Sequence, residues 1–151
     1  LKAGDPLGKV GMSGSATGSH LHFEVRLGEN IYAASRNPEL WLIPLEGPDG
    51  SRYAALAGRI LYPSGYRSEL SSVVIERLTG PKGDAVAQVY LTPYEESALS
   101  GQPPWEETFA AGDLPPGWYR ITFIQFGLQH REVQLLPGQL TLVTFDLRSG
   151  Q

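Results

Sequence analysis

Glycine and proline recur along this chain so often that they leave no room for a long uninterrupted helix. The 151 residues include 18 glycines and 12 prolines, with short runs of aromatic and β-branched residues between them. Glycine and proline both interrupt helices, whereas aromatic and β-branched side chains pack well on a pleated surface. With 41% hydrophobic residues, the chain can also bury a core. The sequence therefore predicts an all-β fold.

Seven candidate strands lie downstream of Arg52, separated by glycine and proline turns. They are Ala55–Leu61, Val73–Leu78, Val86–Thr92, Glu107–Ala110, Gly117–Gln125, Gln129–Leu135 and Leu140–Leu147. Seven short strands within about 95 residues are typical of a β-sandwich. The turn at Pro137-Gly138 predicts a hairpin between the last two strands. The polar segment Tyr94–Trp105 is expected to be a loop, with room for one helical turn at Glu95–Leu99.

Alternation within one of these strands assigns its two faces. In Gly117–Gln125, the side chains of Tyr119, Ile121 and Phe123 should share one face, and those of Trp118, Arg120 and Thr122 the other. Several aromatic residues could instead form a platform for sugar rings: Tyr62, Tyr90, Tyr94, Trp105 and Trp118. Because aromatic and apolar residues alternate inside the strands, we prefer core packing and loop covering for them.

Residues 1–43 form a separate unit in this interpretation. The run His20–Arg26 alternates, with Leu21, Phe23 and Val25 on an apolar face and the histidines, Glu24 and Arg26 on a polar one. Asn37 and Pro38 are typical of the start of a short helical turn. Residues 44–52 hold two prolines and two glycines, which predicts a linker between domains 1–43 and 53–148.

Two histidines at positions i and i+2 of a strand project from the same face. His20 and His22 have this spacing, so their imidazoles could reach one metal ion and a water bound to it. Alone, the pair is a weak signal. The preceding segment of glycine and hydroxyl residues is a turn that could approach a cleft, which makes Ser15 and Thr17 candidate substrate contacts.

Many positions in this unit agree in order and spacing with a known family. They are Gly4-Asp5, Leu7-Gly8, Gly11, Ser13-Gly14-Ser15, Thr17-Gly18, His20–Arg26 and Asn37-Pro38. Residues 1 to about 42 resemble the carboxy-terminal part of the lysostaphin-type zinc metallopeptidases. These are peptidoglycan endopeptidases built on a β fold called the duplicated hybrid motif. Ser19 stands where that family usually has proline.

The resemblance implies a role for each histidine. His22 would be a zinc ligand, and His20 a catalytic histidine beside the metal-bound water. The family's other two ligands, a histidine and an aspartate four positions later, lie upstream of the pair and have no counterpart here. Since a catalytic zinc needs three protein ligands, we expect this chain, which starts at Leu1, to be an inactive fragment. The full-length protein would be a zinc metalloendopeptidase that cleaves peptidoglycan cross-links at the cell envelope or outside the cell.

The second unit also carries a resemblance. The segment Leu114–Tyr119, which reads Leu-Pro-Pro-Gly-Trp-Tyr, and the segment Ala57–Ile60 are similar to carboxypeptidase regulatory-like and collagen-adhesin B-type modules. This implies a seven-stranded, prealbumin-like sandwich appended to an exported enzyme, with no catalytic residues of its own.

Other functional classes have less support from the sequence or are excluded by it. A metal-free relative could serve as a binding or activator module at the cell envelope. A biotinyl or lipoyl carrier needs a lysine at its hairpin tip, where this chain has Met12 and Ser13. A net charge of -4 without any basic run argues against nucleic acid as a partner. The absence of cysteine excludes disulfides and thiolate sites, and no apolar stretch of about 18 residues could span a membrane.

Overall fold

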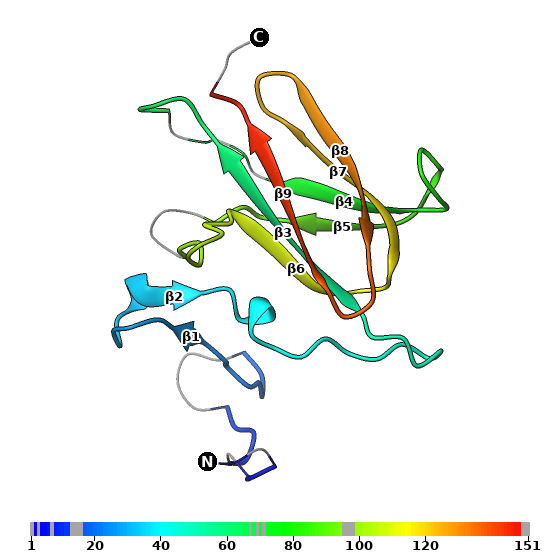
Figure 1. The fold of residues 1–151 in the computed structure, drawn as a ribbon. Helices are drawn as coiled ribbons and strands as arrows, with labels where there is room; N and C mark the ends of the chain where they lie inside the picture. Colours follow the sequence, from blue (N-terminus) through cyan, green and yellow to red (C-terminus); the bar gives the residue numbers. More distant parts are fainter. Residues whose placement is uncertain are drawn as a thin grey trace.

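The computed structural model describes residues 2, 4–6, 8–12, 17–66, 68, 70, 72–94 and 99–148, and these form an all-β protein (Figure 1). Two short strands near the amino terminus, β1 (Val25–Arg26) and β2 (Ser35–Arg36), precede seven longer ones. The longer strands are β3 (Ala54–Leu61), β4 (Val73–Leu78), β5 (Ala85–Leu91), β6 (Phe109–Leu114), β7 (Gly117–Ile124), β8 (Leu128–Leu135) and β9 (Leu140–Asp146). Six of the seven predicted strands are present within one residue of their expected bounds, and the fourth is shifted along the chain.

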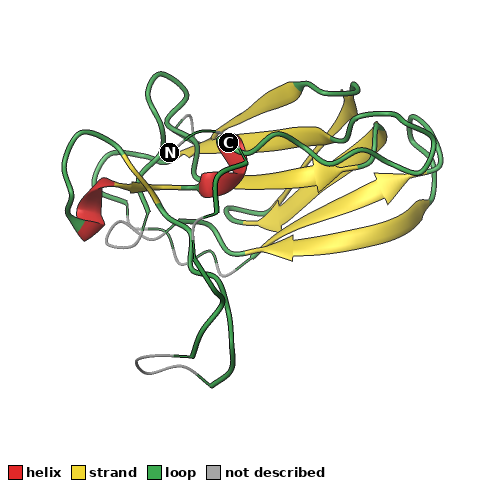
Figure 2. Cartoon of the chain, turned by 90° about the horizontal axis from the view of Figure 1, so that it is seen from below, coloured by secondary structure: helices red, strands yellow, loops and turns green. Residues whose placement is uncertain are grey.

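The seven strands form two sheets that face one another, as in a β-sandwich (Figures 1 and 2). One sheet has the order β6-β3-β9, and the other has the order β5-β4-β7-β8. Residues from both sheets meet in a single buried cluster, which holds them together by the burial of apolar surface.

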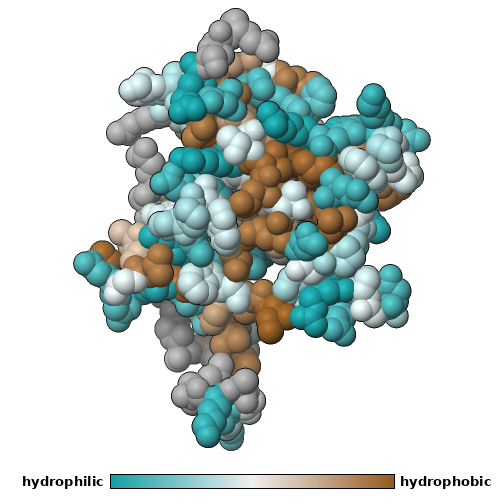
Figure 3. Space-filling model, in the orientation of Figure 1, coloured by the Kyte–Doolittle hydropathy of each residue, from teal (hydrophilic) through white to brown (hydrophobic). Residues whose placement is uncertain are grey.

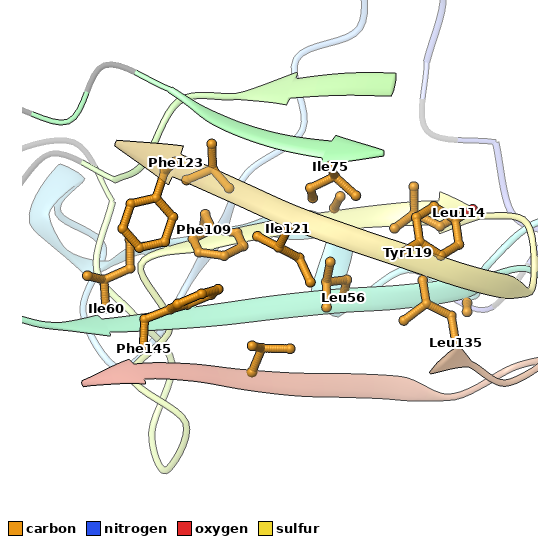
Figure 4. Close-up of a cluster of buried hydrophobic side chains, with 14 of the residues drawn as sticks. Leu56, Ile60, Ile75, Phe109, Leu114, Tyr119, Ile121, Phe123, Leu135 and Phe145 are labelled. Atoms are coloured by element: carbon orange, nitrogen blue, oxygen red, sulfur yellow. The ribbon is translucent and has the colours of Figure 1, made fainter. Parts of the chain in front are cut away.

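Strand β7 supplies the centre of this core with the alternation expected from the sequence (Figure 4). Tyr119, Ile121 and Phe123 are at most 2% exposed, and all three point at the opposite sheet. Phe123 meets Phe145 of β9 edge to face, with ring centroids 4.8 Å apart. The hydroxyl of Tyr119 donates a hydrogen bond of 2.7 Å to the carbonyl of Pro115, so its polar end is satisfied.

Strands β3 and β6 pack closely against each other in the core. Gly58 of β3 lies opposite Phe109 of β6, whose side chain is fully buried. A β-carbon at position 58 would lie 1.9 Å from Cζ of Phe109, far inside van der Waals contact. The ring therefore occupies the space that any other residue at position 58 would need.

The predicted hairpin at Pro137-Gly138 is wrong. The turn exists, but it carries the chain from one sheet to the other: β8 pairs with β7, whereas β9 pairs with β3 in parallel over seven residue pairs. This placement puts Val143, Phe145 and Leu147 into the core, where each is at most 8% exposed. Burial of these three side chains favours the crossover over a local hairpin.

The fourth predicted strand is displaced along the chain. We expected Glu107–Ala110, but β6 runs from Phe109 to Leu114. Glu107 is buried and accepts a hydrogen bond of 2.9 Å from the backbone of Gln102, so it belongs to the preceding loop. Of the helical turn considered at Glu95–Leu99, residues 95–98 lie outside the described part of the chain.

Part of the outer face of the three-stranded sheet is apolar. Its outward side chains include Ala55 and Ala57 of β3, Ala110 of β6, and Leu140 and Leu142 of β9. Figure 3 shows an apolar patch in the middle of the face that it views, where β3 and β9 lie. Small alanines here let β3 be buried on both sides.

Residues 35–45 run along the β6 side of the sandwich. The carboxylate of Glu39 accepts a hydrogen bond from the backbone of Gly112, and Oδ1 of Asp113 accepts one of 2.7 Å from Leu45. The predicted turn is present as η2 (Pro38–Leu40), where Oδ1 of Asn37 accepts a hydrogen bond of 3.0 Å from Glu39. These contacts cover part of an edge strand that would otherwise expose its backbone.

The five aromatic residues considered for a sugar platform do not share one environment. Tyr62 packs against the core cluster and stacks on Tyr66 with ring centroids 5.4 Å apart, whereas Tyr90 of β5 is 63% exposed. Burial raises the pKa of Tyr94 above its usual value.

Among the described residues, no helix has the length and apolar character needed to cross a membrane.

Candidate functional site

The polar run His20–Arg26 is held to the rest of the chain at its two ends. His20 forms an isolated antiparallel bridge with Gly11, and β1 (Val25–Arg26) pairs with β2 (Ser35–Arg36). A second short turn, η1 (Tyr32–Ala34), leads into β2. The alternation predicted one continuous strand here. Among the described residues, however, only the two ends of the run pair with another strand through the backbone.

The side chains on the polar face contact one another in sequence. Nε2 of His22 lies 2.6 Å from Oε1 of Glu24, and Nε of Arg26 donates a hydrogen bond of 2.7 Å to Oε2 of the same carboxylate. Nη1 of Arg26 in turn donates one of 2.8 Å to Oδ1 of Asn30. Residues 22, 24 and 26 thus lie on one side of the chain, as the alternation predicted.

Glu24 is the link in this chain of contacts. Its hydrogen bond with His22, and then the one with Arg26, hold the pKa of its carboxyl below the usual value. The carboxylate is therefore charged at neutral pH and can accept the Nε2 proton of His22. With Nε2 used in this way, the neutral form of His22 keeps a lone pair on Nδ1, and the side chain is 70% exposed.

His20 has a different partner. Its Nδ1 lies 2.9 Å from the carbonyl oxygen of Gly18, which can only accept a hydrogen bond, so Nδ1 must carry the proton. The neutral ring then offers the lone pair of Nε2, the form that a general base or a metal ligand requires. The structure does not join His20 to His22 through any hydrogen bond.

The side chains near His22 are of the kinds that bind a metal ion, but there are too few of them among the described residues. An imidazole whose second nitrogen is held by a carboxylate is a common zinc ligand. Within the described residues, however, no group of three or more histidine, aspartate and glutamate side chains is placed to hold a metal ion. His22 alone could not bind zinc tightly, since affinity comes from three or four converging donors.

The candidate substrate contacts are Thr17 and Ser15. Thr17 is exposed and adjoins Gly18, whose carbonyl orients His20. Ser15 lies outside the described residues.

The apolar face of the run His20–Arg26 is uncovered in the described part of the chain: Leu21 is 73% exposed and Phe23 is 52% exposed.

Sequence reasoning missed the roles of Glu24, Arg26 and Asn30. The signal was available, because a carboxylate two residues after a histidine on an extended segment lies beside it.

Comparison with known proteins adds no relative: family models, curated proteins and solved structures were each searched, and none matches this chain.

Proposed function

We propose that this chain carries the histidine-containing end of a zinc metalloendopeptidase that cleaves peptide bonds in peptidoglycan cross-links. The observation that supports this most strongly is the contact between His22 and Glu24, at 2.6 Å. A bare pair of histidines on a polar surface has many explanations, but a carboxylate that fixes the tautomer of one of them is the arrangement that metal-binding histidines use.

Each residue of the site has a distinct task in this proposal. Glu24 holds the proton on Nε2 of His22, and Arg26 keeps the Glu24 carboxylate in place from its other side. His22 then presents Nδ1 as a ligand. The carbonyl of Gly18 holds the proton on Nδ1 of His20, so that Nε2 of His20 can take a proton from the attacking water. A bound zinc would supply a polarised carbonyl and a water of lowered pKa.

The site needs donors beyond those described here. The resemblance places a histidine and an aspartate upstream of the pair, and we propose that these complete the ligand set in the full-length protein. Ser15 and Thr17 would contact the substrate peptide. The exposed Leu21 and Phe23 support the same view, because a half-site should also show an uncovered apolar face. The protein would act at the cell envelope or outside the cell.

The full-length protein incubated with purified peptidoglycan tests the proposal. We expect soluble muropeptides to appear when zinc is present and to stop after a chelator removes it, with recovery when zinc is restored. The alternative is a metal-free binding or activator module built on the same fold. That protein would sediment with peptidoglycan and release no muropeptide at any zinc concentration.

Exchange of Glu24 for glutamine in the full-length protein tests the orienting contact. Glutamine keeps the shape of the side chain but removes the charge that holds the Nε2 proton of His22. Loss of such an orienting partner typically weakens metal affinity by about 10–100-fold. Competition with a fluorescent chelator would measure this affinity. Glu29→Gln is the matched control, because exposed Glu29 has no hydrogen bond to either histidine. Equal zinc affinity in both variants would remove Glu24 from the site.

A further inference from the structure

A pocket of about 480 Å³ lies at one end of the sandwich, far along the chain from the histidines. Its residues come from the segment before β3, from β4, from the β6–β7 turn and from the β8–β9 connection, which meet at the lower right of Figure 1. Four of its eight lining residues are prolines: Pro48, Pro115, Pro116 and Pro137. Since proline has no backbone N–H, these walls offer mainly apolar surface.

One cation in this pocket has no anionic partner. Arg77 of β4 is half-buried, and its guanidinium makes a single long hydrogen bond, 3.4 Å from Nη2 to the carbonyl of Pro116. None of the ion pairs among the described residues includes Arg77. Gly117 leaves the guanidinium uncovered, because a β-carbon there would lie 3.7 Å from Nε. The planar fork of arginine is suited to a carboxylate bound through two parallel hydrogen bonds.

One anion faces the same pocket. Oδ1 of Asp49 accepts hydrogen bonds of 3.0 Å from the backbone and 2.6 Å from the hydroxyl of Ser51. These bonds hold the pKa of Asp49 below its usual value, so the group is charged at neutral pH. Asp49 and Arg77 do not form an ion pair with each other, and Oδ2 of Asp49 has no hydrogen bond among the described residues.

The two charges restrict which ligand the pocket can accept. A simple anion would pair with Arg77 but would be repelled by Asp49, and a simple cation would meet the reverse arrangement. A ligand with a carboxylate and an ammonium close together satisfies both groups at once. The half-buried ring of Tyr53 and the proline walls would then contact its apolar part.

We propose that this pocket binds a free amino acid, which carries an ammonium and a carboxylate on one carbon. Arg77 takes the carboxylate, Asp49 takes the ammonium, and Tyr53 with the prolines contacts an apolar side chain. The site uses none of the residues of the histidine site and stands independently of the peptidase proposal.

Three small molecules test the contributions of the two charged groups to binding separately. They are leucine, 4-methylpentanoate, which lacks the ammonium, and 3-methylbutylamine, which lacks the carboxylate. Each would be titrated at neutral pH into the 151-residue chain, labelled with ¹⁵N, and followed through the amide signals of Ser51, Tyr53 and Gly117. We expect leucine to bind in the millimolar range and each analogue to bind about tenfold more weakly, the effect of losing one charge-assisted contact.

Two variants then assign the charges. Arg77→Gln should weaken leucine binding about tenfold without weakening 3-methylbutylamine, and Asp49→Asn should weaken leucine similarly without weakening 4-methylpentanoate. Arg52→Gln is the matched control, since Arg52 lies nearby but is paired with Glu46 at 2.7 Å. Equal binding of all three probes, no binding of leucine, or wild-type leucine affinity in a folded Arg77→Gln or Asp49→Asn variant would overturn the proposal. Dispersed amide spectra establish that each variant is folded.

Discussion

A His22→Ala variant of the full-length protein is expected to lose bound zinc and hydrolysis of peptidoglycan together, whereas His20→Ala should keep zinc and lose only rate. The two residues differ because Glu24 orients His22 for a ligand's role, while Gly18 leaves His20 with a free Nε2 that can move a proton. Removal of a general base typically lowers turnover by about 10²–10⁴-fold. Elemental analysis of the purified variants gives the zinc content, and initial rates of cross-link cleavage give the turnover.

His130→Ala is the control for these two variants. His130 is an exposed residue of β8 in the sandwich and should be replaceable without effect on zinc or on rate. A His20 variant with normal turnover would contradict the catalytic assignment. Full zinc content in the His22 variant would show that the ligands had been assigned to the wrong residues.

A Gly58→Ala variant of the sandwich is expected to lose about 3 kcal/mol or more of its free energy of unfolding, at or above the upper end of the usual cost of overpacking a core. The new methyl group would lie within 2.4 Å of three ring atoms of Phe109, and that ring is fully buried. Urea unfolding followed by tryptophan fluorescence measures the loss as a lower midpoint with an unchanged slope.

Two further variants show whether the clash with Phe109 is the cause. Gly80→Ala adds the same methyl group in the turn after β4, where it would meet nothing within 4 Å, and should cost far less. In a Phe109→Leu background, Gly58→Ala should also cost less than in the wild-type chain, because the ring it collides with has been removed. Equal costs in the two backgrounds would point to the backbone of β3 instead.

Much of the sandwich could be predicted from local sequence patterns. The alternation of Tyr119, Ile121 and Phe123 placed the inward face of β7 correctly, because side chains on a strand point to opposite faces in turn. Asn37 and Pro38 located η2, since a side-chain oxygen at the N-cap and a fixed φ at the next residue favour a helical turn locally. These features depend only on neighbours along the chain.

The pairing of strands could not be predicted in the same way. A turn at Pro137-Gly138 looks the same whether it closes a hairpin or carries the chain to another sheet. The outcome depended on where Val143, Phe145 and Leu147 could be buried, and the free side of β3 supplied that place. The position of β6 was likewise decided at a distance, by the fit of Phe109 against Gly58.

The histidine site and the proline-walled pocket also show which features follow from local sequence and which depend on tertiary structure. By itself the sequence determined six of the seven strands, the inward face of β7 and the common side of His22, Glu24 and Arg26, since all of these follow from alternation along a few residues. Only the tertiary structure decided the sheet in which β9 pairs, the pocket that gathers Asp49, Tyr53 and Arg77, and the exposure of Leu21 and Phe23. The physical reason is that burial and strand pairing depend on segments far apart in the chain. A local pattern does not indicate which distant segment will become the partner.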